Sequence, residues 1–318
     1  MGIKDLNRYL LNHCVSPDSI CKNISLSEFK GKIIVVDTSI YIYKFLETNA
    51  LIENMYLLIS IMIDAGIIPV FIFDGKPPPE KRELLYQRKL KKKEAEQLYN
   101  ELKLKQEQDP DQETPDSNRE MEWLQKQFLR INHTHINIVK DLLTAYGIEY
   151  YVASGEADEL CAQLVISNKA WACMSDDMDL LVYGCPRVIR HMSLLNKKAS
   201  LYNLHSILND LHMTLPVFRQ ILVLSGTDYY TNTDYHLQGV LKWYNEFSTQ
   251  PQMMYTDFFE WLNNTHTVDI EFFQKIVSMF LVSEINNSFM DTVFKINEKK
   301  EKDLYLLLQS EGFLVDIK

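Results

Sequence analysis

Short apolar runs alternate with longer amphipathic segments through the first part of the chain. The runs are rich in β-branched and aromatic residues, and each ends at or near an acidic or turn residue: 32–37, 67–74, 147–153, 170–177 and 186–192. Apolar residues at helical spacing lie between them, around 39–64, 133–146 and 156–168. This alternation predicts an α/β fold with a mainly parallel central sheet flanked by helices on both faces.

Residues 80 to 135 interrupt this alternation with a highly charged segment rich in Gln and Lys. Turn residues at 109–117 divide it, so we predict a helix, a turn and a second helix that project as an arch. From about 203 onward, apolar residues recur at helical spacing. We therefore expect a core at 1–202, with the arch insertion at about 80–135, and a helical region at 203–318.

Acidic residues mark the ends of three predicted strands. Asp37 and Asp74 each end a run, and Asp177 and Asp179 follow a third. Taken singly, each could be a helix cap or a turn residue. Because ligands collect at the carboxyl ends of parallel strands, three such ends are expected to bring their acids together at one edge of the sheet.

Two more acids, Glu156 and Asp158, open the helix after the strand at 147–153, and Ser154 is predicted to cap that helix. Gathering so many carboxylates costs free energy unless cations neutralise them. Oxygen ligands at this density suit Mg²⁺, with Mn²⁺ as a substitute. Two such ions can hydrolyse a phosphodiester without a nucleophilic Ser, Cys or His, so the pattern predicts a two-metal hydrolytic site.

Composition limits the class of protein. With 318 residues, 46% of them hydrophobic, the chain can build a full-sized core. Its longest apolar stretch, 51–73, is broken by charged residues, which argues against a membrane span. Five cysteines without a CxxC pair argue against a disulfide framework and a structural zinc site. We expect an intracellular, reducing compartment.

Charge is unevenly distributed along the chain. The net charge of −10 opposes a nucleic-acid partner when it is averaged over all residues. Residues 76–93, however, hold eight basic and two acidic residues, a net charge of +6. A solvated helix face is the ordinary explanation of such a run. The acids described above favour the alternative, a basic surface that grips phosphate.

Several motifs follow one another in order: an MGI start, VVDTSIYIYKF (35–45), VFIFDGKPP (70–78), SGEADELCAQL (154–164), SDDMDLLVYG (175–184) and LSGTDYY (224–230). In this order, with the basic segment between the DGKPP and SGEADEL motifs, they resemble the flap endonuclease and xeroderma pigmentosum group G superfamily. The resemblance covers residues 1 to about 230. It implies a PIN-like nuclease core.

The resemblance also implies which residues form the site. It implies seven carboxylates around two Mg²⁺ ions: Asp37, Asp74, Glu156, Asp158, Asp177, Asp179 and Asp228. Asp158 stands where Glu is commoner in the family. Asp228 taken alone would be a turn or cap residue, and its place in LSGTDYY favours the metal assignment. The expected catalytic residues are Lys81, Arg88 and Asp179.

Four side chains of the first hundred residues are expected to bind nucleic acid. Lys81 and Arg88 match the family residues that reach the scissile phosphate; they lie seven residues apart on one helical face, and Lys92 extends the row. Tyr43 matches an aromatic residue that stacks on a terminal base, with core packing as the alternative.

The chain also departs from the family pattern. The Gly-Ile-Gly hairpin expected after LSGTDYY is replaced by TNTDYHLQGVLKWY, so Lys242 and the helix at 236–247 are the expected substitute for duplex contacts. The C-terminus, LLQSEGFLVDIK, carries no sliding-clamp motif. Acidic residues at 109–122 would repel a second phosphate backbone and screen the arch. Gly2 is expected near the site.

The expected function is a structure-specific 5′ nuclease for DNA flaps or 5′ ends in replication, repair or recombination. It would act in the nucleus or at another site of DNA replication, such as a viral replication compartment. A Holliday-junction resolvase or an RNA-directed 5′ to 3′ exonuclease would share the chemistry. A noncatalytic DNA-binding scaffold is the alternative from another class, although a scaffold would be expected to lose carboxylates that all remain here.

Overall fold

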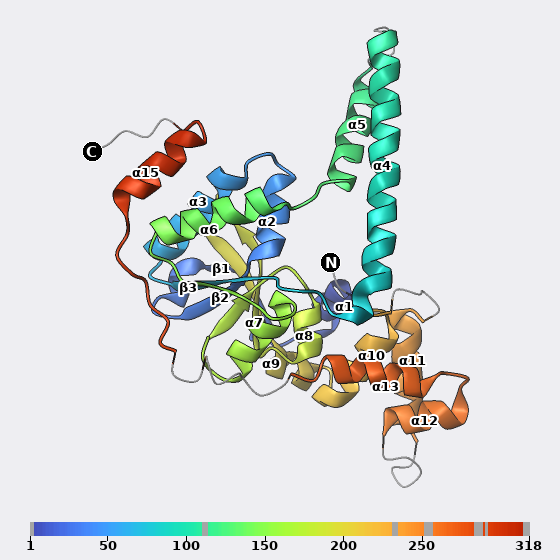
Figure 1. The fold of residues 1–318 in the computed structure, drawn as a ribbon. Helices are drawn as coiled ribbons and strands as arrows, with labels where there is room; N and C mark the ends of the chain where they lie inside the picture. The colour runs from blue at the N-terminus through green and yellow to red at the C-terminus, as the bar shows by residue number, and fades with distance from the viewer. Residues whose placement is uncertain are drawn as a thin grey trace.

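The computed structural model describes residues 3–109, 114–230, 235–250, 257–282, 289 and 292–313. Within these residues a seven-stranded sheet lies between two layers of helices (Figure 1). The strand order is β1-β7-β6-β5-β2-β3-β4. The strands are β1 (Ile20–Ser25), β2 (Ile33–Asp37), β3 (Ile68–Phe73), β4 (Tyr150–Val152), β5 (Ala172–Met174), β6 (Arg187–Ser193) and β7 (Lys198–Asn203). The predicted α/β class is confirmed.

The sheet is parallel at its centre and antiparallel at one edge. Strands β2 to β6, which correspond to the five apolar runs, pair in parallel. Strand β7 pairs antiparallel with β6 and with β1. The sequence did not reveal this antiparallel edge, because β1 and β7 mix polar residues with partly exposed positions and so lack a continuous apolar run.

Both faces of the sheet are buried, which explains the apolar runs. Along β3, Phe71 and Phe73 pack into one core, whereas Val70 and Ile72 pack into the other. The first core is covered by α2 (Thr38–Leu46), α3 (Leu51–Asp64) and α6 (His133–Ala145). The second is covered by α1 (Leu6–His13), α7 (Ala157–Ile166) and α8 (Asp179–Tyr183). In the described ranges no helix has both the length and the apolar character to cross a membrane.

The predicted arch is present and projects from the body (Figure 1). It begins with a 3-10 turn at Pro79–Lys81 and continues as α4 (Arg82–Gln108) and α5 (Pro115–Gln127); residues 110–113, between the helices, lie outside the described residues. The returning chain is fastened to α4 by the Arg130–Glu96 ion pair at 2.6 Å and by Tyr99 against Phe128 at 5.4 Å between ring centroids.

The C-terminal part is helical, as predicted, in the residues described: α9 (Leu204–Asp210), α10 (Leu215–Leu224), α11 (Leu237–Ser248), α12 (Phe258–Thr265), α13 (Ile270–Met279) and α15 (Glu301–Ser310). Helices α10 to α13 contribute buried residues to the second core, whereas α15 lies apart from them against α6 (Figure 1). The division into 1–202 and 203–318 stays a prediction.

Candidate active site

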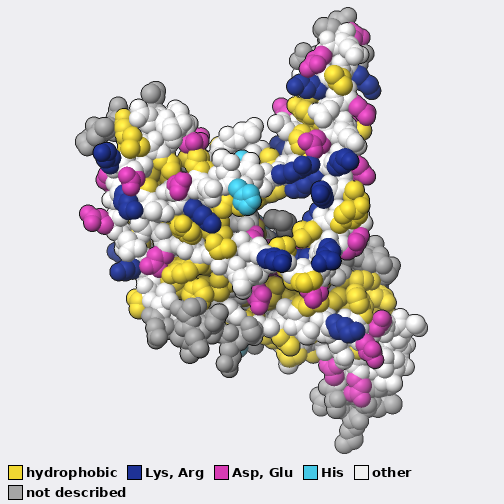
Figure 2. All heavy atoms as spheres, viewed as in Figure 1, with side chains coloured by type: hydrophobic (Ala, Val, Ile, Leu, Met, Phe, Trp, Pro, Cys, Tyr) yellow, Lys and Arg dark blue, Asp and Glu magenta, His cyan; other side chains and the backbone are white. Residues whose placement is uncertain are grey.

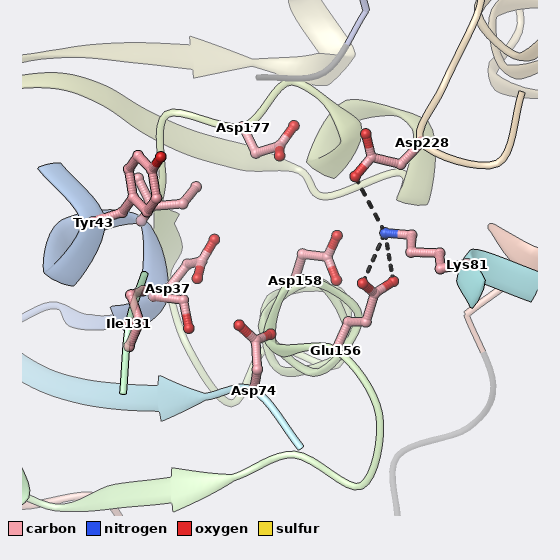
Figure 3. A pocket seen from close by; sticks show the side chains of 11 residues that line it. Asp37, Tyr43, Asp74, Lys81, Ile131, Glu156, Asp158, Asp177 and Asp228 are labelled. Atoms are coloured by element: carbon pink, nitrogen blue, oxygen red, sulfur yellow. Dashed lines mark hydrogen bonds and ion pairs between the residues drawn. The ribbon is translucent and has the colours of Figure 1, made fainter. Parts of the chain in front are cut away.

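A pocket of about 210 Å³ opens at the carboxyl ends of the parallel strands (Figure 3). It is lined by six of the predicted acids: Asp37, Asp74, Glu156, Asp158, Asp177 and Asp228. The seventh, Asp179, is the first residue of α8, and its backbone N–H donates to Asp177 Oδ1 at 3.0 Å. The structure therefore brings all seven acids together.

Strand ends hold the first two acids. Asp37 is the last residue of β2, is 5% exposed and accepts a hydrogen bond from Ser175 Oγ at 3.0 Å. Asp74 follows β3, and its Oδ1 accepts the backbone N–H of Ala157 at 2.8 Å. Asp74, at the end of β3, thus accepts a hydrogen bond from the first backbone N–H of α7, the helix that follows β4.

This contact corrects one sequence prediction. Ser154 does not cap α7, because the helix begins at Ala157 with Glu156 in the N-cap position. Asp74 supplies the acceptor instead, from a residue far away in the sequence. The first turn of α7 carries Asp158, whose Oδ1 accepts the N–H of Glu159 at 2.7 Å.

Asp177 and Asp179 lie in the turn between β5 and α8. The N–H of Asp177 donates to Ser175 Oγ at 3.1 Å, so Ser175 links this turn to Asp37. The Asp179 side chain is almost fully buried, and its Oδ1 has no hydrogen-bond partner among the residues that the structure describes. A buried carboxylate oxygen without a partner is costly unless a ligand or cation takes it.

Burial and mutual repulsion disfavour the charged forms of three acids. Burial, followed by the charge of Glu156, raises the pKa of Asp158 to about 8. Burial and the charge of Asp74 raise the pKa of Asp37 well above its ordinary value. Burial and the charge of Asp177 do the same for the pKa of Asp179. Cations placed among these groups would favour their ionised forms.

The donors in the pocket fit a hard divalent cation. In the ranges the structure describes, no group of three or more His, Cys, Asp and Glu side chains is already arranged to hold an ion. The donor chemistry is nevertheless that of Mg²⁺ or Mn²⁺, because the acids supply only oxygen and carry a large negative charge. The buried Oδ1 of Asp179, to which no described residue donates a hydrogen bond, is a candidate ligand atom.

Lys81 reaches into this set of acids from the base of the arch. Its Nζ lies 2.7 Å from Glu156 Oε2 and 3.5 Å from Asp228 Oδ2 (Figure 3). Burial alone would lower the pKa of Lys81, but the charges of Asp158, Glu156 and Asp228 raise it, so the group stays an ammonium. Arg88 reaches the same carboxylate, with its guanidinium 2.8 Å from Asp228 Oδ1.

The third basic residue of the row takes a different position. Lys92 Nζ donates to the carbonyl of Leu129 at 2.7 Å and lies 5.3 Å from the centroid of the Tyr43 ring. Tyr43 lines the pocket and is only partly buried, and its role in base stacking stays a prediction. Figure 2 shows Lys and Arg side chains along the arch and around the opening at its base.

Of the other residues predicted to bind nucleic acid, one lies away from the pocket and one is not described. Lys242 is exposed on α11, in the helix predicted at 236–247, and does not line the pocket. Gly2 lies outside the described residues, as do 231–234 after LSGTDYY, Asp111 and Glu113 of the acidic stretch, and 314–318 at the C-terminus.

Sequence reasoning missed several side chains that shape the site, among them Ser175, Ile131 and Tyr229. Ser175 binds Asp37, Ile131 lines the pocket from the returning arch, and Tyr229 contacts both Glu156 and Lys81. Ser175 and Tyr229 stand inside the SDDMD and LSGTDYY motifs, so their neighbours could have drawn attention to them. Ile131 gives no such signal.

Comparisons with known proteins agree with this geometry. The XPG N-terminal domain matches residues 1–95, and the XPG I-region matches residues 147–228. Flap endonuclease 1 of Trypanosoma cruzi is 30% identical over 252 residues, which are 72% of this chain and 61% of that protein. The chain thus spans about three fifths of the length of this curated relative.

Two solved structures share the fold. The catalytic core of Rad2 in complex with DNA substrate has a TM-score of 0.67 and 21% identity, with 98% of this chain and 95% of that chain covered. Human GEN1 in complex with Holliday junction DNA has a TM-score of 0.64 and 17% identity, with 97% and 73% covered. Together, the two matched regions and the shared fold show that this chain belongs to the flap endonuclease and xeroderma pigmentosum group G superfamily of nucleases.

Proposed function

We propose that the chain is a structure-specific 5′ nuclease that hydrolyses phosphodiester bonds at DNA flaps or 5′ ends. The observation that carries this proposal is the pocket of acids with Lys81 and Arg88 at the base of the arch. Its relatives are named flap endonucleases, and the Rad2 core with the same fold holds a DNA substrate. Such an activity belongs in an intracellular compartment where DNA is replicated, such as the nucleus or a viral replication compartment.

The carboxylates are the proposed ligands of two Mg²⁺ ions, for which Mn²⁺ can substitute: Asp37, Asp74, Glu156, Asp158, Asp177, Asp179 and Asp228. When bound, divalent cations supply the Lewis acidity that favours attack of water on the phosphodiester. Asp37 and Asp179 are shielded from bulk water, and electrostatic interactions at such buried positions are stronger than in water.

The basic side chains and Tyr43 orient the DNA. Lys81 and Arg88 project over the acids and offer donors for the scissile phosphate. Lys92 lies against the Tyr43 ring, which offers a face for a terminal base beside the acids. None of these contacts reads a base edge, so the site suits recognition of DNA structure.

A second function within the superfamily is resolution of four-way junctions. The fold shared with the GEN1 complex is the observation that favours it. An RNA-directed 5′ to 3′ exonuclease would use the same pocket. A noncatalytic scaffold accounts less well for the acids, because buried carboxylates that repel one another lower stability unless cations bind them.

The test compares end-labelled 5′-flap, 3′-flap, nicked, four-way-junction and single-stranded DNA in Mg²⁺, Mn²⁺ and EDTA. We expect metal-dependent cleavage at the flap base, and its loss in Asp179→Ala with DNA binding retained. Glu159→Gln is the matched control, because this neighbouring acid of α7 does not line the pocket. Binding without cleavage in either metal would support the scaffold instead.

A further inference from the structure

Tyr229 makes two separate contacts with the charged groups of the pocket. Its hydroxyl donates to Glu156 Oε2 at 3.0 Å. Its ring lies under the ammonium of Lys81, with Nζ 4.8 Å from the ring centroid. The same ammonium is held by Glu156 and Asp228, so Tyr229 contacts Lys81 directly and also one of its carboxylate partners.

The Tyr229 ring is itself held firmly. It meets the buried ring of Phe280 at 5.4 Å between centroids and an interplanar angle of 88°. The Tyr183 ring of α8 packs against the same Phe280 ring, with 4.9 Å between the ring centroids. This packing restricts rotation of the Tyr229 ring, whose face lies toward Lys81.

The ring and the carboxylates hold Lys81 by different forces. The ion pairs with Glu156 and Asp228 weaken when cations neutralise those acids, because the ammonium then meets less negative charge. The attraction between an ammonium and an aromatic face does not depend on the charge of the acids, and it strengthens when the ammonium is desolvated. Lys81 is nearly fully buried, so this second force is well placed to act.

We propose that Tyr229 is a positioning residue that keeps the Lys81 ammonium over the acids when the carboxylates are occupied and their ion pairs with Lys81 are weakened. The inference rests on the proposed function, in which Lys81 contacts the scissile phosphate. The ring carries this role, and the hydroxyl orients Glu156.

Two substitutions separate ring from hydroxyl. Tyr229→Leu removes both and is expected to slow single-turnover flap cleavage about tenfold, which corresponds to a loss of one ordinary cation–aromatic contact. DNA affinity stays within about twofold, because Lys81 acts on the scissile phosphate after binding. Tyr229→Phe keeps the ring and retains most of the rate. Equal losses in the two variants would overturn the role of the ring.

A double-mutant cycle tests whether the effect runs through Lys81. Tyr229→Leu added to Lys81→Ala is expected to cost little more than Lys81→Ala alone, whereas multiplied losses would show an independent, structural effect. The matched control is Tyr230→Leu, because the Tyr230 ring packs on Phe273 at 5.0 Å. This variant removes a packed ring at the adjacent position and should leave the cleavage rate within about twofold of wild type.

A spectroscopic measurement tests the positioning without cleavage. In protein with Mg²⁺ added and without DNA, the ¹H–¹⁵N resonance of the Lys81 ammonium, assigned by its loss in Lys81→Arg, should shift in Tyr229→Leu and stay in Tyr229→Phe. An unmoved resonance in Tyr229→Leu would sink the inference even if the enzyme cuts DNA. If wild type cuts no substrate, the proposed function fails, while this shift still decides whether the ring holds Lys81. If Tyr229→Leu does not fold, Tyr229→Met replaces it in each comparison.

Discussion

Asp158 and Asp210 carry the same side chain, yet the fold shifts their pKa values in opposite directions. Burial and Glu156 raise the pKa of Asp158 to about 8. Hydrogen bonds from Ser16 Oγ, the Ser16 N–H and Ser19 Oγ lower the pKa of Asp210 to about 2. Asp158 is expected to bind a cation, whereas Asp210 fastens the loop after α1 to α9, so their effects on stability should depend on pH with opposite sign.

Asp158→Asn should stabilise the metal-free protein at alkaline pH. Because the folded pKa lies above the ordinary value of 3.8, the contribution of Asp158 to stability is present below 3.8 and is lost as pH rises through about 8. The amide avoids this loss, so in EDTA at pH 8.5 we expect a gain on the order of 1–2 kcal/mol, which shrinks toward pH 4. Thermal unfolding at both pH values measures it, and a variant less stable than wild type at pH 8.5 would contradict the assignment.

Asp210→Asn should behave in the opposite way. Because its folded pKa is depressed, Asp210 contributes stability that is present above the ordinary value of 3.8 and is lost as pH falls through about 2. The variant should melt below wild type at pH 7 and approach it near the acid limit. The same melting series checks this, and a gap that persists unchanged at acid pH would count against the hydrogen-bonded carboxylate as its cause.

The expectation that acids at the ends of parallel strands meet at one edge of the sheet located some of the site's acids. It could not locate the side chains that hydrogen-bond to them or pack against them. Asp37, Asp74 and Asp177 follow apolar runs, and parallel strands present such ends at one edge. Asp228 follows no strand, so it depended on the resemblance. Tyr229 could not be assigned from the sequence, because its role comes from contacts with Glu156 and Lys81, which periodicity does not encode.

Between elements, the approach of two loops sets the geometry of the pocket. The N–H of Gly75, after β3, donates to the carbonyl of Gly155 at 2.8 Å. A Cβ at Gly75 would lie 1.9 Å from the carbonyl oxygen of Ala153. These loops carry Asp74 on one side and Glu156 on the other, so their separation determines how the acids face each other.

Gly75→Ala adds only one methyl group, yet it should displace the loops that carry Asp74 and Glu156. The added methyl group meets backbone, which cannot move aside as a flexible side chain can. We expect flap cleavage to fall about a hundredfold, because small displacements of catalytic groups have large kinetic effects. Gly239→Ala on α11 is the matched control, since its Cβ would meet no atom of the described residues within 4 Å and alanine favours a helix. Similar activity in both variants would refute the role of the close approach.

The elements with a strong period were predicted well, whereas those fixed by their partners were not. Strands β2, β3 and β5 are buried on both faces and gave continuous apolar runs. Within the described sheet, strand β1 is an edge strand next to β7 and has no fully buried residue, so its composition resembles that of a loop. The Ser154 prediction was wrong because the first N–H of α7 binds Asp74, which follows β3, instead of a side chain next to it in the sequence.

At the scale of the whole molecule, the chain crosses back after α13 to the face of the sheet that α2, α3 and α6 cover. The N–H of Asn297 donates to the carbonyl of Gly147, and that of Lys300 donates to the carbonyl of Ala145, both at 2.8 Å. Helix α15 then buries Leu304 and Leu308 in the core that α6 covers. The final helix therefore helps to close the nuclease core, which sequence periodicity alone could not show because it gives no partner.

Leu308→Ala should test this closure. The side chain is 4% exposed within the core, and its truncation should lower the free energy of unfolding by about 2–4 kcal/mol. Leu306→Ala on the same helix is the control, because that side chain is 51% exposed and should change stability by less than about 0.5 kcal/mol. Urea unfolding gives both values.

Cleavage per folded molecule should stay unchanged in both variants, since α15 lies across the sheet from α10 to α13 and outside the pocket (Figure 1). Equal unfolding free energies for the two variants would mean that α15 does not close the core in solution.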